Sequence, residues 1–266
     1  MKNRLLYGMI LSLIVIMMSC EKDPYINKGT YFYDGNVLYQ LAEPVADIDG
    51  NVYKTVKLGN QVWMAENLRT TRYADGAPIP LVTATSSAAV RYYPNNNSAN
   101  VTDFGYLYSW YAVMKGSASS GANPSGVQGI CPDGWHVPSS AEWAELTNYV
   151  ESQSQYLCDK SYYHGDEHIA KALASGEGSG WASSYDNCTV GNDPSANNAT
   201  GFSARPAGFG NGSYYGDFGR KAVFWSATQY NSNDAYTRYL DYDGANVYRD
   251  IDYNLGNGYS VRCVRN

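Results

Sequence analysis

The sequence predicts an α+β fold. From residue 202 onward, short runs of β-branched and aromatic residues alternate with turn signals such as Asp243-Gly244 and Asn257-Gly258. Consecutive short strands joined by short turns pair antiparallel. Few segments elsewhere have helical periodicity, and a few helices beside an antiparallel sheet define the α+β class. The chain has no internal repeat.

The first 19 residues have the layout of an export signal. Lys2 and Arg4 precede the apolar run Leu5–Met18, which is shorter than the ~20 residues of a membrane-spanning helix. A small residue directly before Cys20 is typical of a lipobox, so Cys20 is expected to be lipidated; ordinary cleavage with a free cysteine is the alternative. Residues 20–44 have no clear period and are interpreted as a lipidated tether. Residues 45–266 are expected to form one domain.

The domain begins with a predicted hairpin. Val52–Leu58 alternates and is rich in β-branched residues, Gly59-Asn60 supplies a turn, and Gln61–Met64 returns. Residues 85–102, rich in Ser, Ala and Asn, are expected to be an exposed loop. Residues 106–114 are apolar on nearly all sides and predict a buried helix, followed by a Gly/Ser-rich loop over 115–130.

The clearest helix is predicted over 140–150. Ser139 and Glu142 have capping-box spacing, and Trp143, Leu146 and Val150 fall on one face. Residues 169–174 predict a second, short helix. The predicted strands that follow are Phe202–Pro206, Ala222–Ser226, Tyr236–Asp241, Val247–Ile251 and Tyr259–Val264.

Charge and composition restrict the partners. The net charge is −6 over 266 residues, and loss of Lys2 and Arg4 with the signal makes the mature chain more acidic. This argues against nucleic acid and anionic membrane surfaces as partners. With 17% charged and 44% hydrophobic residues the chain is globular. The sequence contains 26 Tyr and 6 Phe. Such a high tyrosine content is typical of a surface that binds sugars or proteins, and equally of a core in which tyrosine packs in place of phenylalanine.

Four cysteines remain after Cys20, namely Cys131, Cys158, Cys188 and Cys263. An even number in an exported protein predicts disulfides, with three connectivities open. The alternative is a reduced metal or redox pair, although the chain contains no Cys-x-x-Cys.

Four separated motifs carry a family resemblance. The run Cys131-Pro-Asp-Gly-Trp-His-Val-Pro-Ser-Ser-Ala-Glu-Trp-Ala-Glu-Leu146 is joined by Asp47–Leu68, Phe224-Trp-Ser-Ala-Thr228 and Gly258-Tyr-Ser-Val-Arg-Cys-Val-Arg265. In this order they resemble the Fibrobacter succinogenes major paralogous domain, a family of bacterial surface and secreted modules. The resemblance implies a fold and a location, and it names no ligand. Trp135, Trp143 and Trp225 lie in these motifs and are expected in the core.

A more distant similarity concerns the fold. Val137-Pro-Ser-Ser-Ala-Glu-Trp143 and Val261-Arg-Cys-Val264 resemble motifs of the formylglycine-generating enzyme family, which has a variant C-type-lectin fold. This implies a C-type-lectin-like topology: a twisted antiparallel sheet, a few flanking helices, long irregular loops, and the first and last parts of the domain side by side. The family-like motifs also imply pairing of Cys131 with Cys263, which leaves Cys158 for Cys188.

Enzymatic candidates are weak. Formylglycine-generating enzymes bind copper through a close pair of cysteines, whereas this chain has a single cysteine, Cys263, near its end. His164-Gly-Asp-Glu-His168 fits a His-x-x-Glu-His zinc motif, but Gly165 is a poor residue inside a helix and Asp166 is a natural N-cap. No Gly-x-Ser-x-Gly occurs, and Gly208–Gly212 reads as a turn. We therefore expect no catalytic residues.

Calcium is the one cofactor that the sequence suggests. Asp47 with Asp49, and Asp241 with Asp243, each offer two carboxylates near a tight turn, as calcium prefers. Neither pair continues into an EF-hand loop, and Asp-Gly is also ordinary turn chemistry. The Glu-Pro-Asn and Trp-Asn-Asp signatures of sugar-binding C-type lectins are absent. No metal site is predicted beyond these weak candidates.

Predicted loops between strands carry aromatic and amide side chains that can stack on a sugar or form a protein-binding surface. The alternative is that they are simply polar turns. The candidate ligand-binding residues are Tyr214, Tyr215, Asp217, Tyr230, Asn233, Asp234 and Tyr242.

The leading hypothesis is a non-enzymatic protein anchored by lipid at the outer membrane or cell surface. Its domain would serve adhesion or recognition, with a glycan or a surface protein as partner. The alternatives are an enzyme acting on surface or dietary polymers, and a pilus-tip or surface-assembly component that associates with fimbrial subunits.

Overall fold

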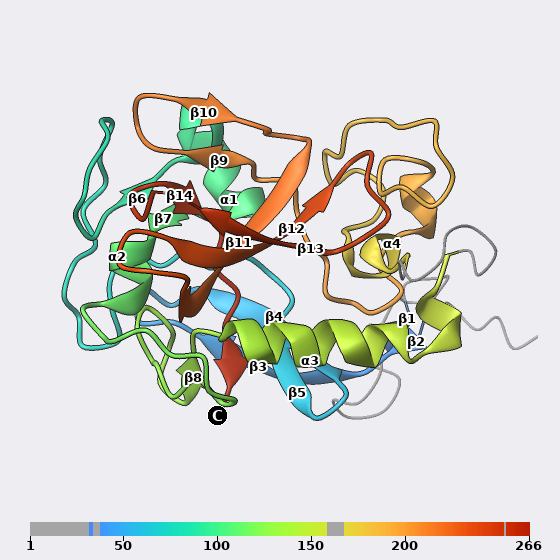
Figure 1. The fold of residues 1–266 in the computed structure, drawn as a ribbon, viewed down its shortest axis with the longest axis horizontal. Helices are drawn as coiled ribbons and strands as arrows, with labels where there is room; N and C mark the ends of the chain where they lie inside the picture. The colour runs from blue at the N-terminus through green and yellow to red at the C-terminus, as the bar shows by residue number, and fades with distance from the viewer. Residues whose placement is uncertain (1–31, 34–37, 159–167, 253) are drawn as a thin grey trace, which may run out of the picture.

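Antiparallel sheets dominate the computed structural model, which describes residues 32–33, 38–158, 168–252 and 254–266. A few helices lie at their periphery, and irregular chain connects them (Figure 1). This architecture is consistent with the predicted α+β class and with a mainly β class. Residues 32–33 and 38–39 form a separate strand pair, β1 Phe32–Tyr33 and β2 Leu38–Tyr39.

One five-stranded sheet contains both ends of the domain. Its order is β3-β4-β5-β15-β8, and the predicted hairpin is confirmed as β4 and β5. The last strand, β15, lies between β5 and β8, because Val264 pairs with Trp63 and with His136. The first and last parts of the domain are therefore side by side, as expected. The strands are β3 Leu41–Ala46, β4 Val52–Leu58, β5 Gln61–Met64, β8 Trp135–His136 and β15 Val264–Arg265.

The sheet begins a few residues before the expected boundary between tether and domain at residue 45. Strand β3 begins at Leu41 and pairs with β4 from Leu41 to Ala46. The last residues of the range 20–44 therefore belong to the sheet.

The front of the molecule in Figure 1 is a three-stranded meander. Its strands are β11 Lys221–Gln229, β12 Ala235–Asp241 and β13 Tyr248–Asp252, and they confirm three of the predicted strands. A second five-stranded sheet has the order β10-β9-β14-β7-β6. Its members are β6 Arg91–Tyr92, β7 Leu107–Ser109, β9 Phe209–Gly210, β10 Tyr215–Gly216 and β14 Gly258–Tyr259.

The long helix α3 is confirmed with its cap. The Ser139 side chain accepts from the Glu142 amide, and the Glu142 side chain accepts from the Ser139 amide. The α-helices are α1 Val101–Phe104, α2 Trp110–Met114, α3 Ser140–Glu151 and α4 Ala170–Leu173; the 3-10 helices are Pro94–Asn96, Ser98–Asn100, Ser154–Tyr156 and Pro194–Ala196. None of the helices in the described part of the chain has the length and apolar character that a membrane span requires.

Two segments before α3 differ from the prediction. Residues 106–114 are not one helix: Leu107–Ser109 is strand β7, and the Ser109 side chain then caps α2. A strand buried on both faces and a buried helix have the same unbroken apolar pattern. The loop expected over 85–102 contains β6 and helical turns, and Tyr92 is buried with its hydroxyl donating to the Gly256 carbonyl.

Two predicted strands near the C-terminus are also wrong in part. Phe202–Pro206 forms one isolated bridge, Ala174 to Ala204, because the carbonyls of Phe202 and Ser203 accept from Arg262 instead of from a neighbouring strand. Tyr259–Val264 is divided between β14 and β15, which belong to different sheets. The residues between them cross the core.

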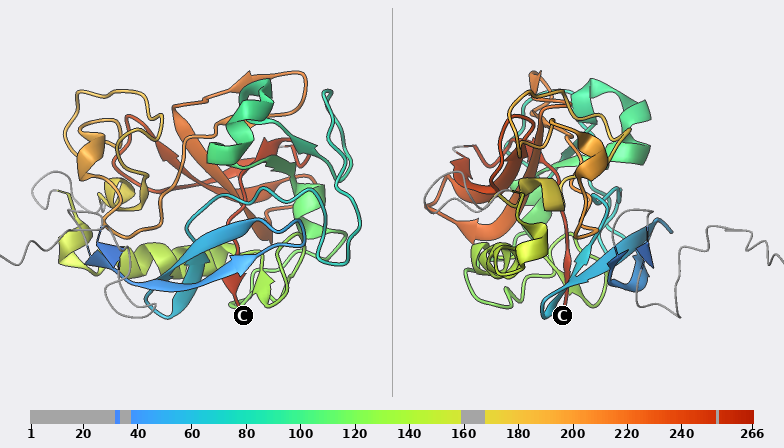
Figure 2. Two further views of the ribbon diagram at one scale, coloured as in Figure 1. Left: turned by 180° about the vertical axis from the view of Figure 1, so that it is seen from behind. Right: turned by 90° about the vertical axis from the view of Figure 1, so that its right-hand side faces the viewer.

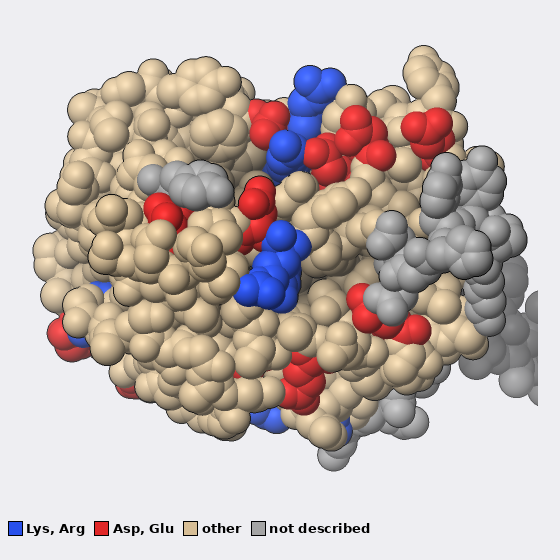
Figure 3. Space-filling view, viewed as in Figure 1, with Lys and Arg blue, Asp and Glu red and all other residues tan. Residues whose placement is uncertain are grey.

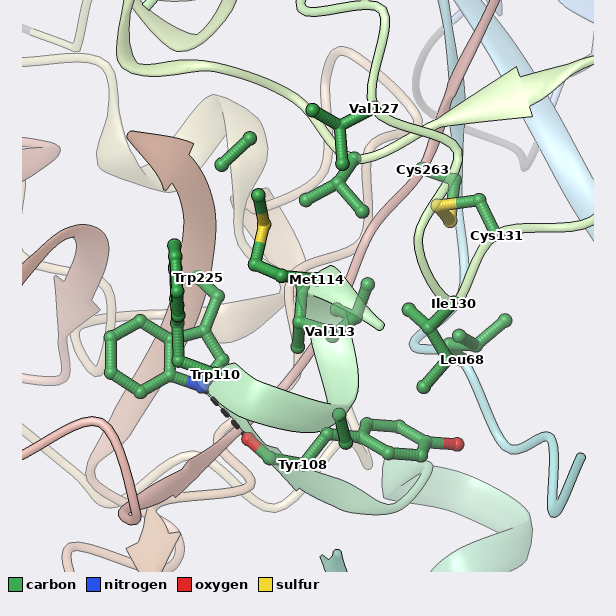
Figure 4. Close-up of a cluster of buried hydrophobic side chains, with 14 of the residues drawn as sticks. Leu68, Tyr108, Trp110, Val113, Met114, Val127, Ile130, Cys131, Trp225 and Cys263 are labelled. Atoms are coloured by element: carbon green, nitrogen blue, oxygen red, sulfur yellow. Dashed lines mark hydrogen bonds between the residues drawn. A yellow bond between two sulfur atoms is a disulfide. The ribbon is translucent and has the colours of Figure 1, made fainter. Parts of the chain in front are cut away.

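A disulfide closes the main core. Cys131 and Cys263 are bonded with Cα atoms 6.0 Å apart, and both side chains are fully buried. Figure 4 shows them beside Ile130 and Leu68, with Trp110 and Trp225 across the same cluster. The second predicted pair, Cys158 with Cys188, is also bonded. Trp135, Trp143 and Trp225 are buried, as expected.

A buried, hydrogen-bonded pair of titratable side chains joins the start of α3 to β8. The His136 Nε2 lies 2.5 Å from the Glu142 Oε1, and His136 Nδ1 lies 2.6 Å from the Asn266 Oδ1. Burial by itself would lower the pKa of His136, but the hydrogen bond and negative charge of Glu142 outweigh it and raise that pKa.

This pair makes stability depend on pH. Because the folded pKa of His136 exceeds its ordinary value of 6.5, its contribution is complete below that value and is lost as pH rises through the folded pKa. We expect the free energy of unfolding, measured in urea from pH 5.5 to 9, to fall across this window by more in the wild type than in His136→Gln. Parallel curves for the two proteins would contradict the assignment.

Candidate functional site

A small polar pocket lies on the outer face of the β11–β12–β13 sheet. Its volume is about 150 Å³, below the ~300 Å³ at which pockets for drug-sized ligands begin, so it suits a single ring or side chain. Successive side chains along a strand alternate between faces, and Thr237 and Tyr239 on β12, with Asp250 and Asp252 on β13, line it together. The other lining residues are Phe209, Asp217, Lys221, Val223, Ile251 and Tyr259.

Aromatic rings are held rigidly around this pocket. Tyr259 packs edge-on against Trp225 with ring centroids 4.8 Å apart, and Phe209 lies 6.2 Å from Tyr259. Tyr239 stacks on Tyr248 at 4.9 Å with an interplanar angle of 20°. The ring faces are therefore positioned before any ligand arrives.

The two carboxylates that β13 contributes to the pocket differ in how many hydrogen bonds they already accept. Asp252 accepts from the Tyr259 hydroxyl, the Asn254 amide at 2.7 Å and the Asn257 side chain at 3.3 Å. Burial raises the pKa of Asp252 against these hydrogen bonds, which lower it. Asp250 is exposed, and one of its oxygens accepts from the Ile251 amide.

One lysine lies among the carboxylates. The Nζ of Lys221 is 3.4 Å from both Asp217 and Asp241, and 5.5 Å from the centre of the Tyr239 ring. Burial alone would lower the pKa of Lys221, but the two carboxylates raise it. Figure 3 views this face and shows acidic and basic side chains interspersed over the meander, surrounded by uncharged surface.

The ligand-binding residues predicted from sequence fall into three separate groups. Asp217 lines the pocket. Its neighbour Tyr214 is 62% exposed and packs on Phe209, whereas the Tyr215 ring lies over Gly210, where a Cβ would be only 2.3 Å from it.

The other two groups lie at opposite ends of the β11–β12 pair. Tyr230, Asn233 and Asp234 are in the turn beyond Gln229, where Asp234 is buried and accepts from the Asn231 side chain. Tyr242 follows the other end, and its hydroxyl accepts from Arg220 at 2.9 Å. The structure does not bring these three groups together.

Most residues of the pocket were not among those predicted from the sequence, because the predicted residues lie in expected loops between strands. Tyr239, Asp250, Asp252 and Tyr259 lie in strands. The sequence does contain a signal for this pocket, which is the alternation of polar residues in Thr237-x-Tyr239 and Asp250-x-Asp252. Alternate residues of a strand share one face, so these polar side chains lie on the face opposite Phe224 and Leu240, which pack in the core.

The calcium candidates are used by the fold itself. Asp47 accepts from the amides of Asp49 and Asn51 and from the Tyr53 hydroxyl. Asp49 pairs with Arg72 at 2.6 Å. Asp241 forms an ion pair with Lys221. The pKa of Asp241 is raised by burial and by the neighbouring Asp243. Within the described ranges, no group of three or more His, Cys, Asp or Glu is placed to hold a metal.

The remaining candidates concern residues at the edge of the described chain. His164 and Glu167 of the zinc-like motif lie outside the described residues, as does Cys20. His168 is half-buried, and its carbonyl accepts from the Cys158 amide.

Comparison with protein families identifies the domain. The sequence profile described as the Fibrobacter succinogenes major domain matches residues 56–265. No curated protein and no solved structure matches the chain.

Proposed function

Because the chain belongs to the Fibrobacter succinogenes major domain family, we propose that it is a cell-envelope recognition protein that binds a glycan in the pocket of the β11–β13 face. The observation that carries the proposal is the combination of fixed aromatic rings with carboxylates around an opening of single-ring size. A pyranose presents an apolar face to an aromatic ring and hydroxyls that donate to carboxylates.

The location is part of the same proposal. Lipidation at Cys20 would tether the domain to the outer membrane or cell surface, since a lipoprotein cysteine carries several acyl chains and more than one is needed for stable anchoring. Two disulfides support an oxidising compartment. A C-type-lectin-like topology is proposed with it, supported by the pairing of β15 with β5.

Recognition is favoured over catalysis by the state of Asp252. A general acid must present its proton to the substrate. The Asp252 oxygens are instead engaged by Tyr259, Asn254 and Asn257. We therefore assign Asp252 the role of holding Tyr259 in place.

A glycan array tests this proposal. We expect selective binding by the full chain, and we expect Tyr239→Ala to weaken it at least about tenfold, because an aromatic anchor is worth at least about 1.4 kcal/mol. Tyr185→Ala is the matched control, since Tyr185 is 98% exposed and is not among the pocket residues.

Two results would overturn the proposal. One is glycan binding that Tyr239→Ala and Tyr185→Ala leave equally intact. The other is hydrolysis of a bound glycan that Asp252→Asn abolishes while the unfolding midpoint is unchanged, which would make the domain an enzyme.

A further inference from the structure

A second, larger pocket opens on a different part of the molecule. It has a volume of about 300 Å³ and shares no lining residue with the pocket of the β11–β13 face. Its walls come from β4, the chain after β5, the region of α1 and the loop 198–205. Figure 2 shows β4 and α1 on the side of the molecule that faces away from the viewer in Figure 1.

Positive charge is in excess around this pocket. Lys54, Arg69 and Arg205 line it, against Glu66 and Asp103. Glu66 is already engaged, since its oxygens accept from the Lys54 amide at 2.7 Å and lie 3.5 Å from the Arg69 guanidinium. Asp103 and Lys54 are both exposed to solvent, which weakens the field of each, so Arg205 is the half-buried cation of this pocket whose charge no described residue compensates. In a chain of net charge −6, such a local excess of cations is unexpected.

A buried arginine adds to the excess. Arg262 is fully buried and donates to the Asn67 side chain and to the carbonyls of Met64, Phe202 and Ser203. All of these acceptors are neutral. Asn67 and Ser203 line the pocket, so the Arg262 charge lies directly behind its wall.

Arg205 lines the pocket with no side-chain hydrogen bond or ion pair to any described residue, as does the more exposed Lys54. Arg205 is half-buried, and within the described ranges no hydrogen-bond acceptor or carboxylate engages its guanidinium. Its charge acts against that of Arg262, whose pKa is lowered by burial, raised by the nearby Glu66 carboxylate and lowered again by Arg205. An unpaired arginine beside a buried arginine is unfavourable for the folded state, and such features occur at binding sites.

Neutral donors complete the wall. Asn198 accepts from the Ser203 amide and hydroxyl through its oxygen, which leaves its amide nitrogen for another acceptor. Thr102, which carries a hydroxyl, also lines the pocket. A guanidinium fork flanked by amide and hydroxyl donors is the arrangement that recognises an oxyanion.

We propose that this second pocket binds the anionic group of a small acidic ligand, with Arg205 as its principal contact. The group is a planar carboxylate, as on a uronic acid, or a free tetrahedral anion such as sulfate. The bound anion would neutralise the field of Arg205 and Arg262 together. This inference is independent of glycan binding at the β11–β13 face, because the residues differ.

Calorimetric titration of the full chain in detergent, at constant ionic strength, tests the proposal with sodium glucuronate, glucose and sodium sulfate. We expect glucuronate to bind at least about tenfold more tightly than glucose. Arg205→Gln should weaken glucuronate binding at least about tenfold, whereas the control Arg220→Gln should not, since Arg220 contacts Tyr242 elsewhere. Sulfate that competes with glucuronate would support the proposal and assign recognition to charge alone.

Stability provides the second measurement. Without ligand, Arg205→Gln should unfold at the same temperature as the wild type or at a higher one, because no native hydrogen bond is lost. With glucuronate present, the wild type alone should gain thermal stability. The proposal is wrong if the wild type binds neither anion, or if Arg205→Gln binds glucuronate as the wild type does.

Discussion

Replacing Arg262 by methionine is expected to lower the free energy of unfolding by at least about 4 kcal/mol. The change removes the Arg262 donor from three buried acceptors and from the part-buried Ser203 carbonyl. Each unsatisfied buried group costs about 1–3 kcal/mol. The guanidinium also lies 4.7 Å from the centre of the Phe202 ring and 5.6 Å from that of Phe224. Methionine fills part of this space and supplies none of the hydrogen bonds.

Urea unfolding of two further variants makes this result specific. Arg262→Lys keeps the charge but not the planar fork, so we expect a loss smaller than that of Arg262→Met and still clearly measurable. Arg265→Met is the matched control, because Arg265 is exposed and its loss should stay within about 0.5 kcal/mol. A loss below about 1 kcal/mol for Arg262→Met would show that Arg262 does not hold the C-terminal segment.

Removing the Cys131–Cys263 disulfide by a double alanine substitution is expected to destabilise the fold by about 5 kcal/mol. The bond closes a separation of 132 residues, and the entropic cost of the open chain grows with loop length. Removal of Cys158–Cys188, with a separation of 30 residues, is expected to cost about 3.6 kcal/mol.

The order of the two losses is the informative result. Unfolding of both double variants in guanidinium chloride, under identical conditions, measures it. Cys131 and Cys263 are fully buried in the main core, so their removal also creates a cavity there. If the Cys158–Cys188 variant proves the less stable of the two, loop length and core position do not govern the contribution of these bonds.

Features set by neighbouring residues were predictable. The β4–β5 hairpin follows from alternation around Gly59-Asn60, and the start of α3 follows from the spacing of Ser139 and Glu142. Both depend on hydrogen bonds between residues a few positions apart. The two disulfides were also predictable, through the family-like motifs that contain Cys131 and Cys263.

Features set by distant residues were not. The segment 202–206 has the composition of a strand, yet its carbonyls are taken by Arg262, 60 residues further along the chain. Tyr259–Val264 reads as one strand, but it serves two sheets because Gly258 pairs with Ser109 and Val264 with Trp63. No local pattern contains these partners.

The candidate sites divide in the same way. The order of the residues alone determined the family and the short antiparallel strands, because these depend on motifs and local spacing, and the family resemblance in turn implied the cysteine pairs. The tertiary structure decided that Tyr239, Asp252 and Tyr259 share one pocket and that Arg205 lies unpaired near Arg262. Those groupings arise when strands and loops from separate parts of the chain are packed together, and burial then determines which charges remain available to a ligand.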